Sequence, residues 1–388
     1  MLRYQLTREP RAIRALAVVS TYPPTRCGLA TFSAALVAAL RTQLPAATVG
    51  VVEIVEQPFP RRNPDVVGQF AGGDERAVAA ATAAIAGFDA AVVQHEYGIY
   101  AGPDGVAVVR LLERLAVPVV TVLHTVLSEP SRSQRQVLER VITSSDAVVV
   151  MADTARERLL ARYQVEPDRV HVITHGATVP RDSAPPRRDD RPTMLTWGLL
   201  GPGKGIEHAI DALAWLRDLR PLPRYVVAGQ IHPKVSERAG ASYRSMLMAR
   251  ARYRGVAEML ELDNRYLSRE ALTTLIRQAD VVVLPYESRE QVTSGVLVDA
   301  VACGRPVVAT AFPHAVELLQ RGAGLTVPHD GVAALAGALR SVLVDPHLAA
   351  RLRGRAEQIA PELSWDTVAG RYLALAGGVA ATRSPVVL

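Results

Sequence analysis

The segment Gly198–Gly205 has residue types suited to holding a phosphate group. It contains four glycines, and Lys204 stands immediately before an expected helix. Glycines let backbone amides approach an anion closely, the start of a helix adds positive potential, and a lysine adds a full charge. The spacing does not match the GxxxxGK-Ser/Thr loop of nucleoside triphosphatases. We therefore expect Gly198, Gly203 and Lys204 to contact a diphosphate, and the alternative is a glycine-rich turn with a solvated lysine.

The segment Tyr286–Asp299 offers a second contact for the same anion. A helix is expected to start here, and the amides of Ser294, Gly295 and Val296 would point from its first turn toward a diphosphate. Asp299 lies about one turn further along on the same side, so its carboxylate could accept hydrogen bonds from ribose hydroxyls. A solvent-facing carboxylate is the alternative for Asp299.

Polar residues also end two apolar segments in the first half of the chain. His95 and Glu96 follow Ala90–Gln94, and they could bind acceptor hydroxyls or transfer protons, unless they form a buried network that closes the loop. His124 follows Val117–Leu123, and its imidazole could hydrogen-bond a sugar hydroxyl without a permanent charge. Because no HExxH spacing follows His95, we expect no metal there.

The loop Thr21–Phe32 carries two prolines and Gly28, just before an expected helix. Gly28 removes a side chain at a helix start, where free amides can meet an anion or a sugar hydroxyl. An ordinary turn between a strand and a helix is the alternative. The loop lacks a GxGxxG pattern, which argues against a nicotinamide cofactor.

Short Val-rich segments alternate with helical patterns along the chain. Continuous apolar segments of this length indicate strands buried on both faces, and their alternation with helices predicts a doubly wound parallel sheet. The expected strands cover residues 15–20, 49–54, 90–94, 117–123, 147–151 and 170–174, and then 194–197, 225–229, 259–262, 281–285, 306–310 and 325–327. Ligands bind at the carboxyl ends of such strands, where the polar loops above lie.

The segment Pro180–Pro192 interrupts this alternation with prolines, arginines and aspartates, and it predicts a solvated linker. We expect an N-terminal Rossmann-like domain over residues 1–180 and a C-terminal one over 192–363. A final amphipathic helix within 364–388 is expected to pack back on the first domain. The fold class is therefore α/β, with two doubly wound parallel sheets facing a central cleft.

These residues together resemble the GT-B retaining glycosyltransferases of family 4. The resemblance rests on the GxxxxxKG loop with Gly198, Lys204 and Gly205, and on the segment ACGRPVVAT at Ala302–Thr310 with the acidic helix before it. It covers nearly the whole chain, and it implies an acceptor-binding N-terminal domain and a nucleotide-sugar-binding C-terminal domain. Leu199 departs from the family pattern, which has an arginine at this position.

The pair of acidic residues that the family spaces eight apart is also altered. It maps to Gln291, which has Glu290 beside it, and to Asp299. The first acid usually touches the donor sugar, so the resemblance assigns Glu290 and Gln291 to donor recognition. Without the family's arginine, Lys204 would carry the diphosphate charge alone or with Arg289.

The resemblance implies retention at the anomeric carbon and no required metal or other cofactor. The donor would be a nucleotide-sugar such as GDP-mannose or UDP-glucose, with GDP-mannose favoured on overall likeness, and the acceptor a carbohydrate or a lipid-linked group. Lys204 would stabilise the leaving diphosphate, His124 would orient the donor sugar, and His95 and Glu96 would face the acceptor. A sugar-nucleotide epimerase of the same fold, or a catalytically weakened nucleotide-sugar-binding protein, are the alternatives.

The composition sets wider limits on these expectations. Forty-four basic and 38 acidic residues give a net charge of +6, and two cysteines exclude a disulfide framework. No segment approaches the length of an apolar membrane span. We expect a cytoplasmic protein without a nucleic-acid partner. Peripheral contact with an anionic membrane is a further hypothesis, based on arginines within 238–254 and the amphipathic stretch Ala30–Leu44; a solvated arginine face is its alternative.

Overall fold

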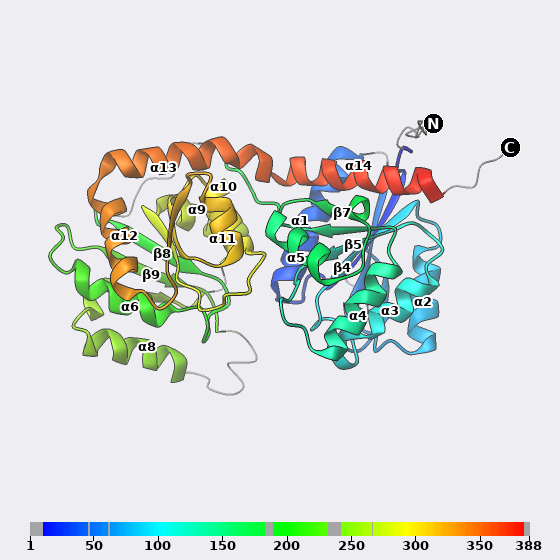
Figure 1. Ribbon diagram of the computed structural model, residues 1–388, viewed down its shortest axis with the longest axis horizontal. Helices are drawn as coiled ribbons and strands as arrows, with labels where there is room; N and C mark the ends of the chain where they lie inside the picture. Colours follow the sequence, from blue (N-terminus) through cyan, green and yellow to red (C-terminus); the bar gives the residue numbers. More distant parts are fainter. Residues whose placement is uncertain are drawn as a thin grey trace. The chain divides into compact units, whose positions relative to one another are not determined.

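The computed structural model describes residues 11–45, 47–60, 63–182, 189–231, 242–265 and 267–383. The chain forms two compact units (Figure 1). Unit 1 comprises Met1–Gly176 together with Trp365–Leu388, and unit 2 comprises Ala177–Ser364. Of the expected linker, residues 183–188 lie outside the described part of the chain.

Unit 1 is built on a seven-stranded parallel sheet with the order β3-β2-β1-β4-β5-β6-β7. Its strands are β1 (Ala15–Ser20), β2 (Thr48–Val55), β3 (Val66–Ala71), β4 (Ala90–His95), β5 (Val119–Leu123), β6 (Ala147–Val150) and β7 (Val170–Val172). Its helices are α1 (Gly28–Gln43), α2 (Glu75–Ile85), α3 (Ala107–Arg114), α4 (Arg132–Thr143), α5 (Asp153–Arg162) and α14 (Trp365–Arg383).

Unit 2 contains a six-stranded parallel sheet with the order β10-β9-β8-β11-β12-β13. Its strands are β8 (Thr193–Trp197), β9 (Arg224–Ala228), β10 (Leu260–Asp263), β11 (Val281–Leu284), β12 (Val307–Thr310) and β13 (Gly324–Val327). Its α-helices are α6 (Ile206–Leu213), α8 (Ser242–Tyr253), α9 (Arg269–Gln278), α10 (Gly295–Ala302), α11 (Pro313–Leu319), α12 (Val332–Val344) and α13 (Pro346–Ile359), and the short 3-10 helix η3 (Ala214–Leu216) follows α6.

The central strands of both sheets are buried on both faces, as their Val-rich sequences predict. All six residues of β4 and all four of β11 are buried. The two doubly wound parallel sheets are therefore confirmed. β3 was not predicted, because it lies at the sheet edge and its sequence VVGQFA is only partly apolar and partly buried.

The final helix, α14, belongs to unit 1. It packs on α1, β4 and β5, and it contributes Tyr372 and Ala376 to the buried core of that unit. At its start, the Trp365 ring fills the space beside Gly176, where a Cβ atom would come within 2.2 Å of the ring. The chain thus returns to its first sheet after completing the second.

Candidate functional site

In unit 2, the loop between β8 and α6 takes a shape that only glycine permits at its end. Gly205 has a φ of +64° and directly precedes α6. A Cβ atom at Gly205 would lie 1.7 Å from the carbonyl oxygen of Pro285, so the loop and the end of β11 meet backbone to backbone. Gly203 also has a positive φ, of +87°, but a Cβ atom there would meet nothing within 4 Å. The two glycines thus have different structural roles.

Lys204 is held between these two glycines as a half-buried cation. Its Nζ lies 4.3 Å from the centre of the Tyr286 ring, which is itself stacked on Phe312 at 5.3 Å. Burial lowers the pKa of Lys204 below its usual range. Lys204 makes no ion pair with any described residue. A partly desolvated ammonium group without a carboxylate partner is well placed to attract an anion.

The start of α10 lies close to this loop. A Cβ atom built on Gly198 would come 3.9 Å from the Val296 side chain, in the first turn of α10. The side chain of Ser294 caps the helix by accepting a hydrogen bond from the amide of Leu297, at 3.3 Å. The amides of Gly295 and Val296 belong to the first turn, which has no acceptor within its own helix. The glycine loop and a helix start therefore converge, as the sequence suggested.

The amide of Ser294 does not fit that expectation. We expected it to bind the diphosphate, but it donates to Nδ1 of His314 at 2.8 Å, inside the unit. His314 is buried at the start of α11, and its ring needs a hydrogen-bond partner there, which the Ser294 amide supplies. The Ser294 amide is therefore already satisfied, and the anion contacts at this end of α10 fall to Gly295 and Val296.

The residues expected to recognise the donor sugar and the ribose differ in how far they are exposed to solvent. Glu290 is exposed, whereas Gln291 is half-buried and donates from Nε2 to the carbonyl of Thr293 at 3.0 Å. Asp299 is half-buried, and burial raises its pKa to about 7. Leu199, where the family has an arginine, is half-buried in the same loop as Lys204.

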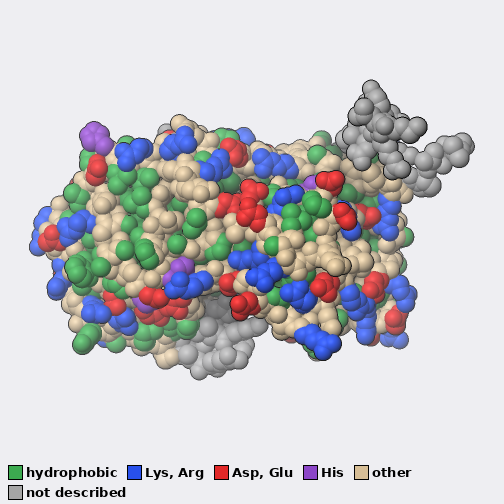
Figure 2. Space-filling view, viewed as in Figure 1, with side chains coloured by type: hydrophobic (Ala, Val, Ile, Leu, Met, Phe, Trp, Pro, Cys, Tyr) green, Lys and Arg blue, Asp and Glu red, His purple; other side chains and the backbone are tan. Residues whose placement is uncertain are grey.

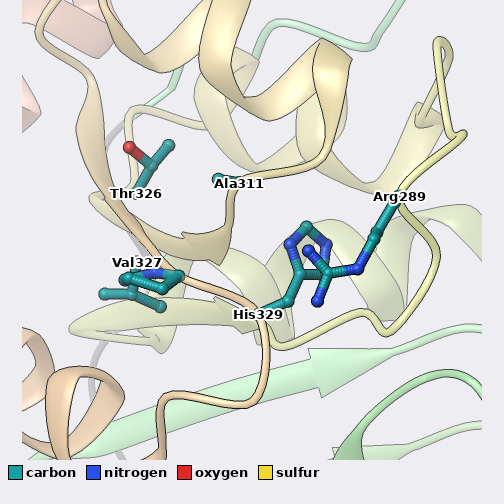
Figure 3. A pocket seen from close by; sticks show the side chains of 6 residues that line it. Arg289, Ala311, Thr326, Val327 and His329 are labelled. Atoms are coloured by element: carbon teal, nitrogen blue, oxygen red, sulfur yellow. The ribbon is translucent and has the colours of Figure 1, made fainter.

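Arg289, expected as a second charge for the diphosphate, lines a cavity in unit 2. This cavity has a volume of about 540 Å³, and it is lined by Arg289, Ala311, Thr326, Val327, Pro328 and His329. The side chains of Arg289 and His329 lie next to each other there (Figure 3). Arg289 forms an exposed ion pair with Asp330, at 3.1 Å. Part of its charge is therefore already neutralised.

In unit 1, the loop after β1 leads into α1. Cys27 caps the helix through Sγ, which accepts from the amide of Ala30 at 3.4 Å. A Cβ atom at Gly28 would meet nothing within 4 Å, and the backbone there is not left-handed. The fold therefore does not require glycine at position 28, and the space beside it is open.

The imidazole of His124 is fixed on two sides. Its Nε2 lies 2.7 Å from Oε1 of the fully buried Gln94, and its ring meets Phe32 edge-on at 5.0 Å. Burial lowers the pKa of His124 to about 3, with smaller contributions from His175 and His95. The ring is therefore neutral at physiological pH, and donation from Nε2 to Gln94 leaves Nδ1 as a hydrogen-bond acceptor.

The structure corrects the expectation for His95. Its side chain is completely buried, and neither ring nitrogen has a hydrogen-bond partner among the described residues. Burial lowers the pKa of His95 to about 4. The reason is that β4 is a central strand covered on both faces, and it extends through His95. His95 therefore lies inside the unit and does not reach a substrate in this arrangement.

Glu96 stands just beyond β4 and is partly buried. It accepts a hydrogen bond from the Thr125 hydroxyl at 2.5 Å and another from the amide of Tyr97 at 3.0 Å. Burial raises its pKa, although these two hydrogen bonds oppose the shift. Glu96 is thus part of the network that joins the loops after β4 and β5.

Sequence reasoning gave no role to Gln94, and it missed the aromatic cluster around Phe32. The Phe32 ring contacts the rings of His124, His175 and Trp365, each at 5.0–5.1 Å. An amide side chain at the end of a strand of Ala and Val is a usable signal for Gln94, because such a group needs a partner when buried. No local sequence pattern indicated Trp365, because it is far from Phe32 in the sequence and approaches it only in the fold.

The described residues contain no group of three or more His, Cys, Asp or Glu side chains that could hold a metal ion. Nor does any single described helix have the length and apolar character of a membrane span; α12 and α13 with its following turn pass that test only as a pair, which is bent by 94° and is weak evidence.

Two family models match the chain, one in each half. Residues 32–179 match Glycosyltransferase Family 4, and residues 181–359 match Glycosyl transferases group 1. The curated relatives include a D-inositol 3-phosphate glycosyltransferase of Jonesia denitrificans, 31% identical over 61% of this chain, and an alpha-D-kanosaminyltransferase of Streptomyces kanamyceticus, 27% identical over 57%. These matches span 58% and 56% of the relatives' own lengths.

Solved structures share the fold over more of the chain. HepE of Anabaena, in complex with UDP and glucose, superposes with a TM-score of 0.72 and 17% identity, covering 92% of this chain and 98% of HepE. The lipopolysaccharide glycosyltransferase WaaG gives 0.65 and 16%, covering 93% and 98%. With both halves matched by family models and both sheets matched by these structures, the chain belongs to the GT-B glycosyltransferases of group 1 and family 4.

Proposed function

We propose that this protein transfers a hexosyl group from a nucleoside diphosphate sugar to an acceptor hydroxyl. The observation that carries the proposal is the half-buried Lys204, which makes no ion pair with a described residue and stands beside a helix start. In the reaction, the bond between the anomeric carbon and the diphosphate oxygen breaks, and the acceptor oxygen bonds to that carbon. The hydroxyl proton is released with the nucleoside diphosphate.

Unit 2 supplies the chemistry for the leaving group. The diphosphate gains negative charge as the glycosidic bond breaks, and the ammonium of Lys204 with the amides of Gly203, Gly295 and Val296 offers fixed positive potential for it. Asp299 would accept from the ribose hydroxyls in its ionised form. Because these groups supply positive charge themselves, we propose that a divalent metal is not required.

Unit 1 supplies a neutral imidazole and a carboxyl group, both suited to sugar hydroxyls. His124 would orient the donor sugar through the ring nitrogen that Gln94 does not engage. Glu96 alone would contact the acceptor, because His95, which was expected to act with it, is buried. The open space beside Gly28 would admit a ligand next to the start of α1. We also propose that the configuration at the anomeric carbon is retained, because the chain resembles the retaining glycosyltransferases of family 4.

Two classes of donor are candidates, namely GDP-linked and UDP-linked sugars. GDP-mannose is favoured on overall likeness to family members, and HepE, of the same fold, binds UDP and glucose. The acceptor is proposed as a carbohydrate or lipid-linked hydroxyl, and the names of curated relatives add phosphorylated cyclitols to the panel worth testing.

The test is to incubate the pure protein with GDP-, UDP- and ADP-hexoses, with and without EDTA, and to quantify the released nucleoside diphosphate. Release from one donor only, unchanged by EDTA, supports the proposal and names the donor. Release that EDTA abolishes contradicts the metal-independent part. The product's anomeric configuration by NMR, once an acceptor from the panel reacts, decides retention.

The same assay separates the alternatives. An epimerase would return a nucleotide-sugar with an altered sugar and no free diphosphate. A binding protein would show nucleotide-dependent thermal stabilisation without turnover. If no donor is turned over and no nucleotide stabilises the fold, the assignment of the donor site to Lys204 and α10 is wrong.

A further inference from the structure

Large hydrophobic side chains on the surface are concentrated in one region of unit 2. Six such side chains are exposed among the described residues. Four of them come from η3, α8 and α12, which all contact α6: Trp215 of η3 is 61% exposed, Met246 and Tyr253 of α8 are 38% and 86% exposed, and Val344 of α12 is 57% exposed. We call this region, with the arginines described next, the α8–α12 surface.

Arginines surround these apolar side chains. Arg217, Arg220 and Arg252 are exposed and form no ion pair with a described residue. Further arginines are partly neutralised, since Arg250 and Arg254 both bind Asp211, and Arg340 binds Asp218. The surface therefore carries an excess of positive charge.

The same ion pairs join α8 to α6, and α12 to η3 and the turn after it. Arg250 and Arg254 of the α8 end bind Asp211 of α6 at 2.6–2.9 Å, one helical turn before Trp215. Arg340 of α12 binds the carbonyl of Trp215 as well as Asp218. Figure 2 shows basic and hydrophobic side chains, with some acidic ones among them, over the end of unit 2 that carries α8 and α12, at the left.

This arrangement corrects the membrane hypothesis made from the sequence. Arg238 lies outside the described residues, and Arg244 is half-buried with its guanidinium on the carbonyl of Gly229. The apolar face of α1 is not available either, because it packs into the core of unit 1 and against α14. The arginines and apolar side chains that do reach the surface come from three places: η3 and the turn after it, α8, and the C-terminal end of α12.

We propose that the α8–α12 surface binds an anionic lipid bilayer. Tryptophan and tyrosine rings favour the level of lipid headgroups, aliphatic side chains such as those of Met246 and Val344 favour the hydrocarbon just below, and arginines bind lipid phosphates. A second copy of the chain is a poor occupant, because a twofold contact would set arginine against arginine. Nucleic acid is also a poor occupant, because it offers no apolar region for the aliphatic side chains to contact.

The test is cosedimentation of the full chain with vesicles of phosphatidylcholine alone or mixed with phosphatidylglycerol. We expect binding only to the mixed vesicles, falling as salt rises. Arg217→Glu combined with Arg252→Glu should weaken binding at least fivefold for each arginine, because one cationic side chain contributes about that factor at an anionic surface. Trp215→Ala combined with Tyr253→Ala should weaken it roughly tenfold.

Matched variants in unit 1 control for charge and for apolar surface. Arg76→Glu with Arg132→Glu makes the same change of charge, and Phe59→Ala removes another exposed ring; both should bind vesicles as the unchanged protein does. Thermal unfolding shows that each variant is folded, and donor turnover is not needed as a readout. Absence of binding to mixed vesicles, or equal loss in the unit 1 controls, overturns the proposal. So does vesicle-independent binding of an oligonucleotide that the same arginine changes abolish.

Discussion

The two units have the same type of sheet but carry opposite kinds of chemistry at their strand ends. Unit 2 presents a cation and backbone amides, with Lys204 between glycines that let the chain approach closely. Unit 1 presents neutral imidazoles, with His124 and His175 packed on Phe32 and their pKa values lowered to about 3 and about 4 by burial. Under the proposed function, this difference would suit unit 2 to an anion and unit 1 to uncharged hydroxyls.

The largest effect is expected at Lys204. Lys204→Met keeps the length and apolar stem but removes the charge, and it should lower donor turnover by about 10²–10³-fold, as for a lost group that stabilises a leaving anion. Lys204→Arg keeps a positive charge, so its donor turnover should fall much less. Initial rates of diphosphate release measure both. Full activity of the Lys204→Met variant would contradict the role of unit 2 in binding the anionic diphosphate.

The glycines of the unit 2 loop should differ from each other in stability. Gly205→Ala meets the carbonyl of Pro285 at 1.7 Å and must adopt a positive φ, so we expect a loss of about 3 kcal/mol or more. Gly203→Ala has open space and only the backbone cost, about 1 kcal/mol. In unit 1, Gly28→Ala should leave stability unchanged. Urea unfolding compares the three, and equal losses at Gly203 and Gly205 would contradict the close approach of the two backbones.

Acid should weaken unit 1 before unit 2. His95, His124 and His175 have pKa values lowered to between about 3 and about 4, so the unfolded chain takes up protons below about pH 6.5 while the folded unit does not. Stability is therefore full above pH 6.5 and falls toward pH 4, by on the order of 3 kcal/mol for each histidine. Asp299, with its pKa raised to about 7, acts in the opposite direction, since unit 2 loses stability as pH rises from about 4 to 7.

Tryptophan fluorescence can follow each unit separately in that experiment. Trp365 reports on unit 1 and Trp197 on unit 2, in backgrounds where the other tryptophans are replaced by phenylalanine. His175→Gln should flatten the acid loss in the unit 1 signal and leave the unit 2 signal unchanged. The same acid midpoint for both signals would show that the histidines do not set it.

The smallest effect is expected at Gln94. Gln94→Leu should lower kcat about tenfold with little change in KM, because it frees the His124 ring without removing it. Gln94→Glu should raise the pKa of His124 by adding a negative charge, and it should introduce a fall in activity at lower pH. Gln69→Leu, an amide replaced on β3 in the same sheet, is the control and should leave kcat unchanged.

Much of the fold followed from the sequence because the central strands are continuous Val-rich segments. β1 was predicted to the residue, and β4 differed by one residue at its end. β3 was missed because an edge strand is covered less and need not be apolar throughout.

The site was harder to predict, since the sequence gives the order of residues but not the direction of their side chains. The glycine loop and the start of α10 were both predicted to contact an anion, and the structure brings them together at Gly198 and Val296. Whether an amide is free depends on distant partners, however, as His314 shows for Ser294. One extra residue in β4 placed His95 inside the unit, and no local pattern marks where a strand ends to that precision.

The return of α14 to unit 1 has a consequence for how the chain is made. The core of unit 1 includes Tyr372 and Ala376, and the gap beside Gly176 is filled by Trp365, although unit 2 is encoded in between. During synthesis, unit 2 can therefore complete its core while unit 1 still waits for its last helix. Until translation reaches that helix, the part of α1 that packs on α14 stays uncovered, and exposed apolar surface of this kind makes a nascent unit prone to aggregation.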